Sequence, residues 1–449
     1  MAIAAATVFE VRTTGSDSNG GGFVTGSGGS DFSQQNSAQG TGTNLTVDAT
    51  TNTDVTPDSY TVSSADVGNI IQITTTGGGA AFTVGFYQIV SIQGGTKWRL
   101  DRSPAATSSS GASWSIGGAL ASPGMASGAA SVSGNIIWVK SGTYTITSTS
   151  SNVSNGRLTG GTKYLVRGYN STRADLAIGD ANRPVIKAGV NSLTIFTSSS
   201  NYASLNDLVL DGDKATRTST TGTAGSSEAH FYNVLARNFT SHGFSGSSAR
   251  AVFCEAADNT AHGMAIDAVA FSWSHGNGGS GFGTGVGGTN YFGCVSSGNG
   301  SNGFQQLRNA RVINCTAYNN TGDGADGDDA DTTYVNCIFY GNGGYGIDDN
   351  GMIGVKAVNC AFRNNTSGAN RSIVSNLNFN PITLTADPFV NAAAGNFALN
   401  AAAGGGALLR ALGYGTLPGG LTVGYPDVGA VQARSTSGKR LGVKIGRVG

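Results

Sequence analysis

The amino-acid sequence predicts an all-β solenoid, because three kinds of residue recur along it at one shared period. Cysteine recurs, with Ser274 standing where one step of the series lacks a cysteine. A glycine followed by an apolar side chain recurs beside it, and so does asparagine. The three series are Cys254, Cys294, Cys315, Cys337 and Cys360; Gly243-Phe244, Gly263-Met264, Gly281-Phe282, Gly303-Phe304, Gly324-Ala325 and Gly346-Ile347; and Asn259, Asn277, Asn299, Asn320, Asn342 and Asn365. A common period of about 20–22 residues is typical of stacked, repeating coils.

The composition of the repeat favours strands over helices. A helical hairpin repeat typically needs about 33 residues or more. Short apolar runs such as Arg311–Ile313 and Tyr334–Val335 alternate with glycine and asparagine turns, which suits strands of a few residues. A coil of about 21 residues that rises about 4.8 Å to the next coil is one turn of a parallel β-helix. Leucine-rich repeats share the period, but their leucine framework is absent.

The first part of the chain is expected to form the first coil of the solenoid, followed by a segment that does not belong to the solenoid. A strand-like run at Val8–Arg12 precedes the glycine-rich segment Gly15–Phe23. Residues Ser30–Gly118 lack the repeat rhythm and alternate apolar and polar side chains over short spans joined by glycine-rich turns. This alternation is typical of a small antiparallel β domain. We therefore expect such a domain to be inserted near the N-terminus.

The solenoid pattern begins at Asn135–Ile146 and continues into the repeats, fading after Asn380. Pro426–Val431 has the character of one last strand. The final residues carry basic side chains and no acidic ones, and we expect an assembly role for Lys439, Arg440, Lys444 and Arg447. The expected parts are residues 1–29 (strand and first coil), 30–118 (inserted β domain), 119–432 (parallel β-helix) and 433–449 (basic tail).

Composition and charge exclude several classes of protein. Glycine makes up 71 of 449 residues without triplet order, which excludes collagen. Only 12% of residues are charged and the formal net charge is zero, so neither a disordered charged chain nor a nucleic-acid-binding face is expected. Just three of the 26 acidic residues are glutamate (Glu10, Glu228 and Glu255). Aspartate suits turns, where it bonds its own backbone, so this bias agrees with a chain of short strands.

The cysteines and the N-terminus bear on the compartment. Stacked cysteines on adjacent coils could reach disulfide distance, but an odd number in one inward column favours buried free thiols and a reducing compartment. No run approaches the roughly 18 apolar residues of a membrane span. The N-terminal run Met1–Ala6 lacks the basic and apolar regions of a signal peptide. Synthesis in the cytoplasm is therefore expected.

Particular segments resemble those of a known superfamily. Asn135–Ile146 resembles the opening coil of pectate-lyase-like proteins in its "GD-x-I-x-V-x-x-GxY" form, although Asn135 stands where an aspartate is common. Leu208–Gly212 resembles an internal "L-x-L-D-G" coil, and Pro426–Ala430 resembles a closing "P-D-I-G-A" strand. The resemblance implies a right-handed parallel β-helix. Glycine-rich chains of this build are similar to virion proteins of tailed bacteriophages, including tailspikes and appendages, which usually form trimers.

An acidic turn is the first candidate for chemistry. Five aspartates lie within nine residues: Asp323, Asp326, Asp328, Asp329 and Asp331. Hard cations take several oxygen ligands, so this turn could hold Ca²⁺, as aspartates do in the pectate lyases that the chain resembles. The spacing lacks the layout of an EF-hand loop, and no lysine or arginine lies nearby in sequence to act as a base. A solvated acidic loop without metal is the alternative.

A second candidate is a pair of carboxylates for glycosidic hydrolysis, which must lie roughly 5–9.5 Å apart. The residues that could supply such a pair are Asp207, Asp211, Asp213, Asp348 and Asp349. The first three share one strand face if the segment is extended. An ordinary turn at Asp211-Gly212-Asp213 is the alternative. His242 and His262 share one repeat position and should stack, but two ligands do not make a zinc site.

These expectations converge on a virion protein of a tailed phage that serves in assembly or attachment without catalysis. Its expected partners are other virion proteins and two further copies of the chain. The alternatives are a tailspike depolymerase that cleaves host surface polysaccharide and an adhesin that binds a host glycan without turnover. No cofactor is expected beyond the possible Ca²⁺. The superfold hosts many functions, so the fold alone does not choose among them.

Overall fold

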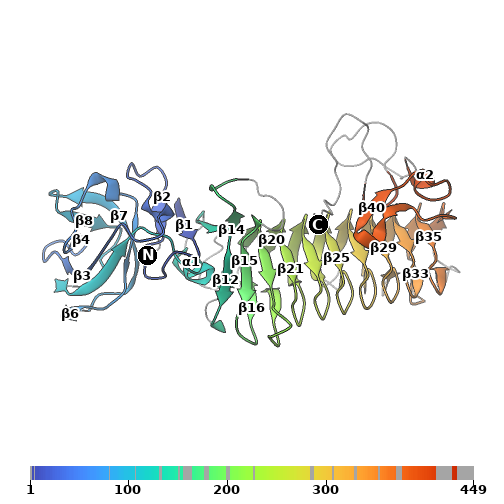
Figure 1. Cartoon of the computed structure of the whole chain (residues 1–449), viewed down its shortest axis with the longest axis horizontal. Helices are drawn as coiled ribbons and strands as arrows, with labels where there is room; N and C mark the ends of the chain where they lie inside the picture. The colour runs from blue at the N-terminus through green and yellow to red at the C-terminus, as the bar shows by residue number, and fades with distance from the viewer. Residues whose placement is uncertain are drawn as a thin grey trace. The chain divides into compact units, whose positions relative to one another are not determined.

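A computed structural model of the chain describes most of its residues (Figure 1). They are 3–4, 6–79, 81–106, 108–130, 134–149, 152–154, 164–175, 182–198, 203–225, 228–283, 288–305, 308–327, 331–351, 354–370, 377–410 and 427–431. The chain divides into two compact units, one of Met1–Val190 with Ile195–Val209 and one of Asn191–Thr194 with Leu210–Gly449. We call them unit 1 and unit 2.

Unit 1 contains a closed antiparallel barrel, drawn in blue in Figure 1. Its strands, in spatial order, are β10 (Ala112–Ile116), β3 (Gly40–Val47), β4 (Asp54–Thr56), β8 (Lys97–Leu100), β7 (Gly85–Gln93) and β5 (Ile70–Ile73). The short strands β6 (Gly78–Gly79) and β9 (Ser109–Ser110) pair beside it, and η2 (Ser64–Asp66) joins β4 to β5. The rings of Trp98 and Trp114 meet edge to face in the barrel core at 5.0 Å. Each indole N–H donates to a carboxylate at 2.8 Å, that of Asp66 or Asp58, so neither buried donor is left unpaired.

The remaining strands of unit 1 belong to the coils of the solenoid. β1 (Thr7–Val11) pairs with β2 (Gly22–Val24) on one side and, in parallel, with β11 (Ile136–Lys140) on the other. The barrel is therefore inserted between two coils that are neighbours in space. The further elements are η1 (Phe32–Gln34), α1 (Pro123–Ala129), β12 (Thr143–Ile146), β13 (Val153–Ser154), β14 (Tyr164–Tyr169), β15 (Val185–Ala188), β16 (Thr194–Ser198), β17 (Ala203–Asn206) and, at the border with unit 2, β18 (Val209–Asp211).

Unit 2 is a stack of parallel coils in which each coil contributes one strand to each of two long sheets. The strands of the first sheet are β20 (Ala229–Tyr232), β22 (Phe244–Val252), β24 (Met264–Ala270), β26 (Asn290–Phe292), β28 (Arg311–Ile313), β31 (Thr333–Val335), β34 (Lys356–Val358) and β37 (Leu377–Phe379). Those of the second sheet are β21 (Leu235–Arg237), β23 (Glu255–Ala257), β25 (Trp273–His275), β27 (Val295–Ser297), β29 (Thr316–Tyr318), β32 (Ile338–Tyr340), β35 (Ala361–Arg363) and β38 (Ile382–Thr383). Shorter strands complete some coils: β19 (Thr221–Gly225), β30 (Ala325–Asp326), β33 (Tyr345–Asp348) and β36 (Gly368–Asn370).

The predicted columns stack inside these coils. Each asparagine of the ladder donates from its Nδ2 to the Oδ1 of the asparagine one coil further on, at 2.8–3.0 Å from Asn259 through to Asn365. The apolar column is buried, and the rings of Phe282 and Phe304 stack with their centroids 4.9 Å apart. The asparagine ladder satisfies polar groups that the turns bring into the interior, which is where an unpaired group costs most.

The cysteine column also faces inward, and all five thiols are free and buried, as predicted. One detail of the prediction was wrong. The backbone N–H of Cys254 donates to Ser272 Oγ at 3.0 Å, in the way that the N–H of Cys294 donates to Cys315 Sγ at 3.4 Å. Ser272 therefore fills the gap in the column, whereas Ser274 pairs in register with Ala256 and Ser296.

The end of the described chain folds back over unit 2. β39 (Phe389–Asn391), η5 (Ala392–Ala394), β40 (Asn396–Leu399) and α2 (Gly406–Leu409) form this segment, drawn in orange and red in Figure 1. Its apolar side chains join one core cluster with outward-facing residues of the second sheet, such as Trp273 and Ile338. Residues 428–431, expected to form a last strand, instead form bends that continue this cover: the N–H groups of Gly429 and Ala430 donate to Asn336 O and Thr316 Oγ1.

The parallel coils and the inserted barrel confirm the fold class that the sequence predicts, an all-β parallel β-helix with a small antiparallel domain near the N-terminus. The α-helices within the described part of the chain, α1 and α2, have seven and four residues. Among the described residues, no helix is both long enough and apolar enough to cross a bilayer.

Candidate functional site

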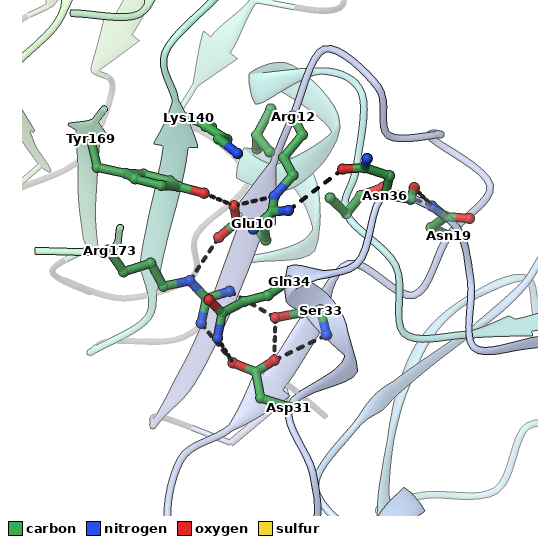
Figure 2. Close-up of polar contacts among 12 residues, drawn as sticks. Glu10, Arg12, Asn19, Asp31, Ser33, Gln34, Asn36, Lys140, Tyr169 and Arg173 are labelled. Carbon is green, nitrogen blue, oxygen red and sulfur yellow. Dashed lines mark hydrogen bonds and ion pairs between the residues drawn. The ribbon is translucent and has the colours of Figure 1, made fainter. Parts of the chain in front are cut away.

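A cluster of polar side chains in unit 1 surrounds Glu10 in β1 (Figure 2). Its carboxylate is fully buried and accepts from Arg12 Nε at 2.8 Å, from Arg173 Nε at 2.7 Å and from the Tyr169 hydroxyl. Arg173 reaches on to Asp31 at 2.7 Å and donates to Ser33 Oγ at 2.8 Å. The cluster thus joins three parts of unit 1: the first strand, the short helix η1 before the barrel, and the coil after β14.

The cluster places the Glu10 carboxyl group between the guanidinium groups of Arg12 and Arg173. Burial, and then the negative charge of Glu10, raise the pKa of Tyr169, so its hydroxyl stays protonated and serves as a donor. Burial by itself lowers the pKa of Arg12, but the hydrogen bond to Glu10 and the charge of Glu10, together with Tyr169, outweigh it, so the pKa of Arg12 is raised. Because the Glu10 carboxylate is closed to solvent, the cluster can fix the start of the solenoid, but it presents no reactive group to a substrate.

Sequence reasoning did not select Glu10. One signal was available, since it is one of only three glutamates and interrupts a strand that is otherwise apolar or β-branched. A charge in a fully buried strand requires partners. Its partners Tyr169 and Arg173 lie 159 and 163 residues further along the chain, so no local pattern identifies them.

The aspartates proposed for hydrolysis each have structural contacts. Asp207 forms an ion pair with Arg167 at 3.3 Å, and Asp211 forms one with Arg237 at 2.9 Å. Asp211 Oδ1 also accepts the backbone N–H of Asp213, whose own carboxylate accepts from a nearby threonine hydroxyl at 2.6 Å. Asp207 and Asp213 have φ of 59° and 50°, so they occupy corners. The segment is therefore not one extended strand, so the condition for a shared strand face is not met, and the turn predicted at Asp211–Asp213 is present.

The acidic turn is only partly within the described chain, because Asp328 and Asp329 lie outside it. Asp323 Oδ1 accepts the N–H of Tyr345 at 2.6 Å, and Asp331 lies 3.5 Å from Lys356 Nζ. No group of three or more metal-binding side chains occurs among the residues that the structure describes. Ca²⁺ binding at this turn stays a prediction.

The structure brings Asp326 and Asp348 into register on adjacent parallel strands. Neighbouring strands lie about 4.8 Å apart, so these side chains emerge within one strand spacing of each other. The Asp326 carboxylate accepts from the amide of Asn302 at 3.0 Å and from that of Asn350 at 2.5 Å. Asp348 and Asp349 are nearly buried, and each caps the turn after β33 by accepting a backbone N–H two residues on, at 3.0 and 2.9 Å.

The predicted histidine stack is present, with the rings of His242 and His262 5.2 Å apart and 14° from parallel. His242 Nδ1 accepts the N–H of His262 at 3.3 Å, and His262 Nδ1 accepts the N–H of Ser280 at 3.0 Å. Burial lowers the pKa of both histidines. The pair therefore acts as a pair of neutral hydrogen-bond acceptors in the turn. The basic residues proposed for assembly, Lys439, Arg440, Lys444 and Arg447, lie outside the described residues.

Comparison with known proteins gives structural similarities only. No family model matches the sequence, and no curated protein matches it. ORF18 of Geobacillus virus E2 is 13% identical with a TM-score of 0.39, over 56% of this chain and 52% of that one, so the match spans about half of the viral protein. Pectate lyase Pel9A is 18% identical with a TM-score of 0.43, over 70% of this chain and 91% of that one. The A-module of the Azotobacter vinelandii mannuronan C-5 epimerase AlgE6 is 15% identical with a TM-score of 0.35, over 56% and 91%.

At this level of similarity, what those proteins act on cannot be transferred to this chain. The strand order of the chain itself carries the structural conclusion. The protein is a parallel β-helix with an inserted antiparallel barrel.

Proposed function

We propose that this chain is a non-catalytic β-helix component of a tailed-phage particle, serving in assembly or attachment. One observation carries the non-catalytic part. Each described aspartate selected as a candidate nucleophile, acid or base accepts from an arginine, a threonine hydroxyl or a turn N–H. Hydrolysis needs one carboxyl group free to give a proton and another free to attack or to activate water.

The virion part of the proposal rests on the resemblance of the sequence to phage appendage proteins. The fold is compatible with it. A stack of coils whose interior is filled by asparagine, cysteine and aromatic columns is suited to a structural role. The inserted barrel and the basic C-terminal residues are the parts proposed to contact other virion proteins, and the coils are the parts proposed to contact two further copies.

The test uses purified phage particles. We expect the chain to be a stoichiometric component by mass spectrometry, and immunogold labelling should place it at one structural position. Deleting residues 437–449 should leave the protein folded and lower its incorporation into particles. Absence of the chain from purified particles would contradict the virion assignment. Normal incorporation of the truncated chain would mean that the barrel or the coils, and not the tail, attach the protein to the particle.

A second candidate, a depolymerase of host surface polysaccharide, is favoured by the register of Asp326 with Asp348. Two carboxyl groups about 5–5.5 Å apart are typical of retaining glycosidases. Release of reducing ends from a host polysaccharide, abolished by Asp348→Asn and by Asp326→Asn but not by Asp331→Asn, would establish this activity. We expect no release from the wild-type protein.

A further inference from the structure

Four aromatic side chains form a continuous ridge along the corner between the two sheets of unit 2. They lie on four successive coils, and we call them the corner ridge: Tyr232, Phe253, Phe271 and Phe292. Successive ring centroids are 5.6, 5.5 and 5.2 Å apart. Tyr232 is 48% exposed and Phe253 is 36% exposed, while Phe271 and Phe292 are partly exposed. Large apolar side chains lined up in solvent on consecutive coils require an explanation.

Two of these rings are held by an unusual backbone. Phe253 and Phe271 have φ of 55° and 50°, in the left-handed region that bulky side chains rarely adopt. On the other coils this corner is taken by residues that tolerate the conformation: Asn233, Gly293, Asn314, Asn336, Asn359 and Asn380. Asparagine would therefore suit the two exceptional coils as well. Backbone strain of this kind persists at functional positions, where the side chain is wanted for something other than folding.

A glycine on the next coil leaves room for the ring of Phe271. Gly293 has φ of 63°, and a Cβ atom at this position would lie 2.8 Å from Phe271 Cδ1. The ring of Phe271 therefore lies against bare backbone, beside Phe292. Phe253 and Phe271 stack at 17° from parallel, whereas the two end rings meet their neighbours edge-on. The centre of the ridge thus consists of two stacked rings between two edge-on aromatic neighbours.

A column of polar side chains accompanies the ridge on the outer face of the first sheet. These residues occupy the strand position two before the outward apolar one, and so share its face: His230, Arg250, Asn290 and Arg311. All four are exposed. On the coil of Phe271 the equivalent position is taken by Ala268, which interrupts the polar column. Neither Arg250 nor Arg311 forms an ion pair with any described residue. Guanidinium groups in this position are suited to bidentate contact with an acidic group of a ligand.

The size of the ridge distinguishes between two kinds of occupant. An aromatic side chain buries about 150–250 Å² when fully covered, so four partly exposed rings offer on the order of 300 Å². A stable protein interface needs about 800 Å² from each partner. A sugar chain needs much less, because each ring contacts the apolar face of one sugar while nearby polar groups bond its hydroxyl and acidic groups.

We propose that the corner ridge binds an extended acidic glycan, with its sugar rings along Phe253 and Phe271 and its acidic groups at Arg250 and Arg311. This site goes beyond the proposed role in the particle and does not depend on it. A protein absent from the virion could bind this glycan, and a virion component could fail to do so.

The test is binding to immobilised polysaccharides by the full-length chain, with alginate, polygalacturonate and hyaluronan as acidic probes and dextran as the neutral one. We expect at least one acidic probe to bind and dextran not to bind. The double variant Phe253→Asn/Phe271→Asn should weaken binding at least about tenfold. Asparagine is the residue that other coils carry at this corner, so the variant should fold. Arg250→Gln/Arg311→Gln should weaken binding and reduce its dependence on salt.

The control is Phe379→Asn, which removes a still more exposed aromatic side chain from the same sheet outside the ridge. It should bind like the wild type. Failure of the wild type to bind any acidic probe, equal binding by the Phe253→Asn/Phe271→Asn variant, or equal binding of dextran would overturn the proposal. So would a variant that keeps glycan binding but loses self-association in sedimentation, because the ridge would then be a contact between copies of the chain.

Discussion

The two long sheets of unit 2 carry similar apolar residues on their outer faces, yet the residues have different surroundings. On the second sheet, Trp273, Tyr318 and Tyr340 pack against Phe389 and Phe397 of the C-terminal segment. On the first sheet, Tyr232 and Phe379 remain about half exposed. An outward position on a solenoid therefore belongs to the core only where a later part of the chain covers it. The two faces differ in what covers them more than in their strand pattern.

The largest effect should come from removing an aromatic residue that covers the second sheet. Phe397 is 2% exposed and contacts Trp273, Tyr318 and Phe389. Phe397→Ala should lower the free energy of unfolding by about 3–5 kcal/mol, because it removes a buried ring and leaves a cavity. Phe379→Ala, on the uncovered face, should change it by about 0.5 kcal/mol or less. Urea unfolding of both variants measures the difference, and equal losses would contradict the conclusion that the C-terminal segment makes only the second face part of the core.

A reciprocal exchange at the corner of the first sheet should have a smaller effect of predictable sign. Phe253→Asn should stabilise the chain by about 1 kcal/mol, because asparagine tolerates the left-handed backbone at this corner. Asn314→Phe, three coils further on, should destabilise it by at least as much, because Asn314 is buried. Urea midpoints compared at unchanged slope test this. A destabilised Phe253→Asn would mean that ring stacking outweighs backbone strain.

The sequence allowed the coils to be predicted because stacking imposes one period on residues that meet inside. Cysteine, asparagine and the glycine-apolar pairs all lie at positions where like side chains meet. The gap in the cysteine column was misassigned because coil lengths vary. Ser272 follows Cys254 by 18 residues, whereas dividing the interval evenly leads to Ser274. Strand register, and not residue counting, decides which side chain faces inward.

The candidate sites were less predictable, since their contacts come from distant parts of the chain. The pairing of Asp207 with Arg167 and of Asp211 with Arg237 joins residues 40 and 26 positions apart. The corner ridge was missed for a different reason. In the sequence alone, a phenylalanine at a turn looks like any apolar residue. Only the structure shows that the residues at the same corner of neighbouring coils are asparagine and glycine.

The stability of the chain should depend on pH through the turn that carries His242 and His262. Burial lowers the pKa of both, so the unfolded chain binds protons that the folded chain does not. Their contribution to stability is complete above the unfolded value of about 6.5 and is lost as the pH falls below it. Melting temperature should therefore drop between pH 7 and pH 5. A His242→Gln/His262→Gln variant should show a smaller drop, and an identical drop would assign the pH dependence to other groups.

The smallest expected effect concerns the interior beneath the corner ridge. Cys254 follows Phe253 directly, yet its thiol is only 2% exposed and faces the same column as Cys315 and Cys360. Burial raises the pKa of the Cys315 and Cys360 thiols, which keeps them protonated and unreactive. A thiol reagent should label no cysteine in the native chain and all five after unfolding without reductant. The Phe253→Asn variant should behave in the same way, because the ridge lies outside the coil wall. If Cys254 becomes reactive in that variant, Phe253 seals the interior, and its unusual backbone would serve packing instead of a ligand.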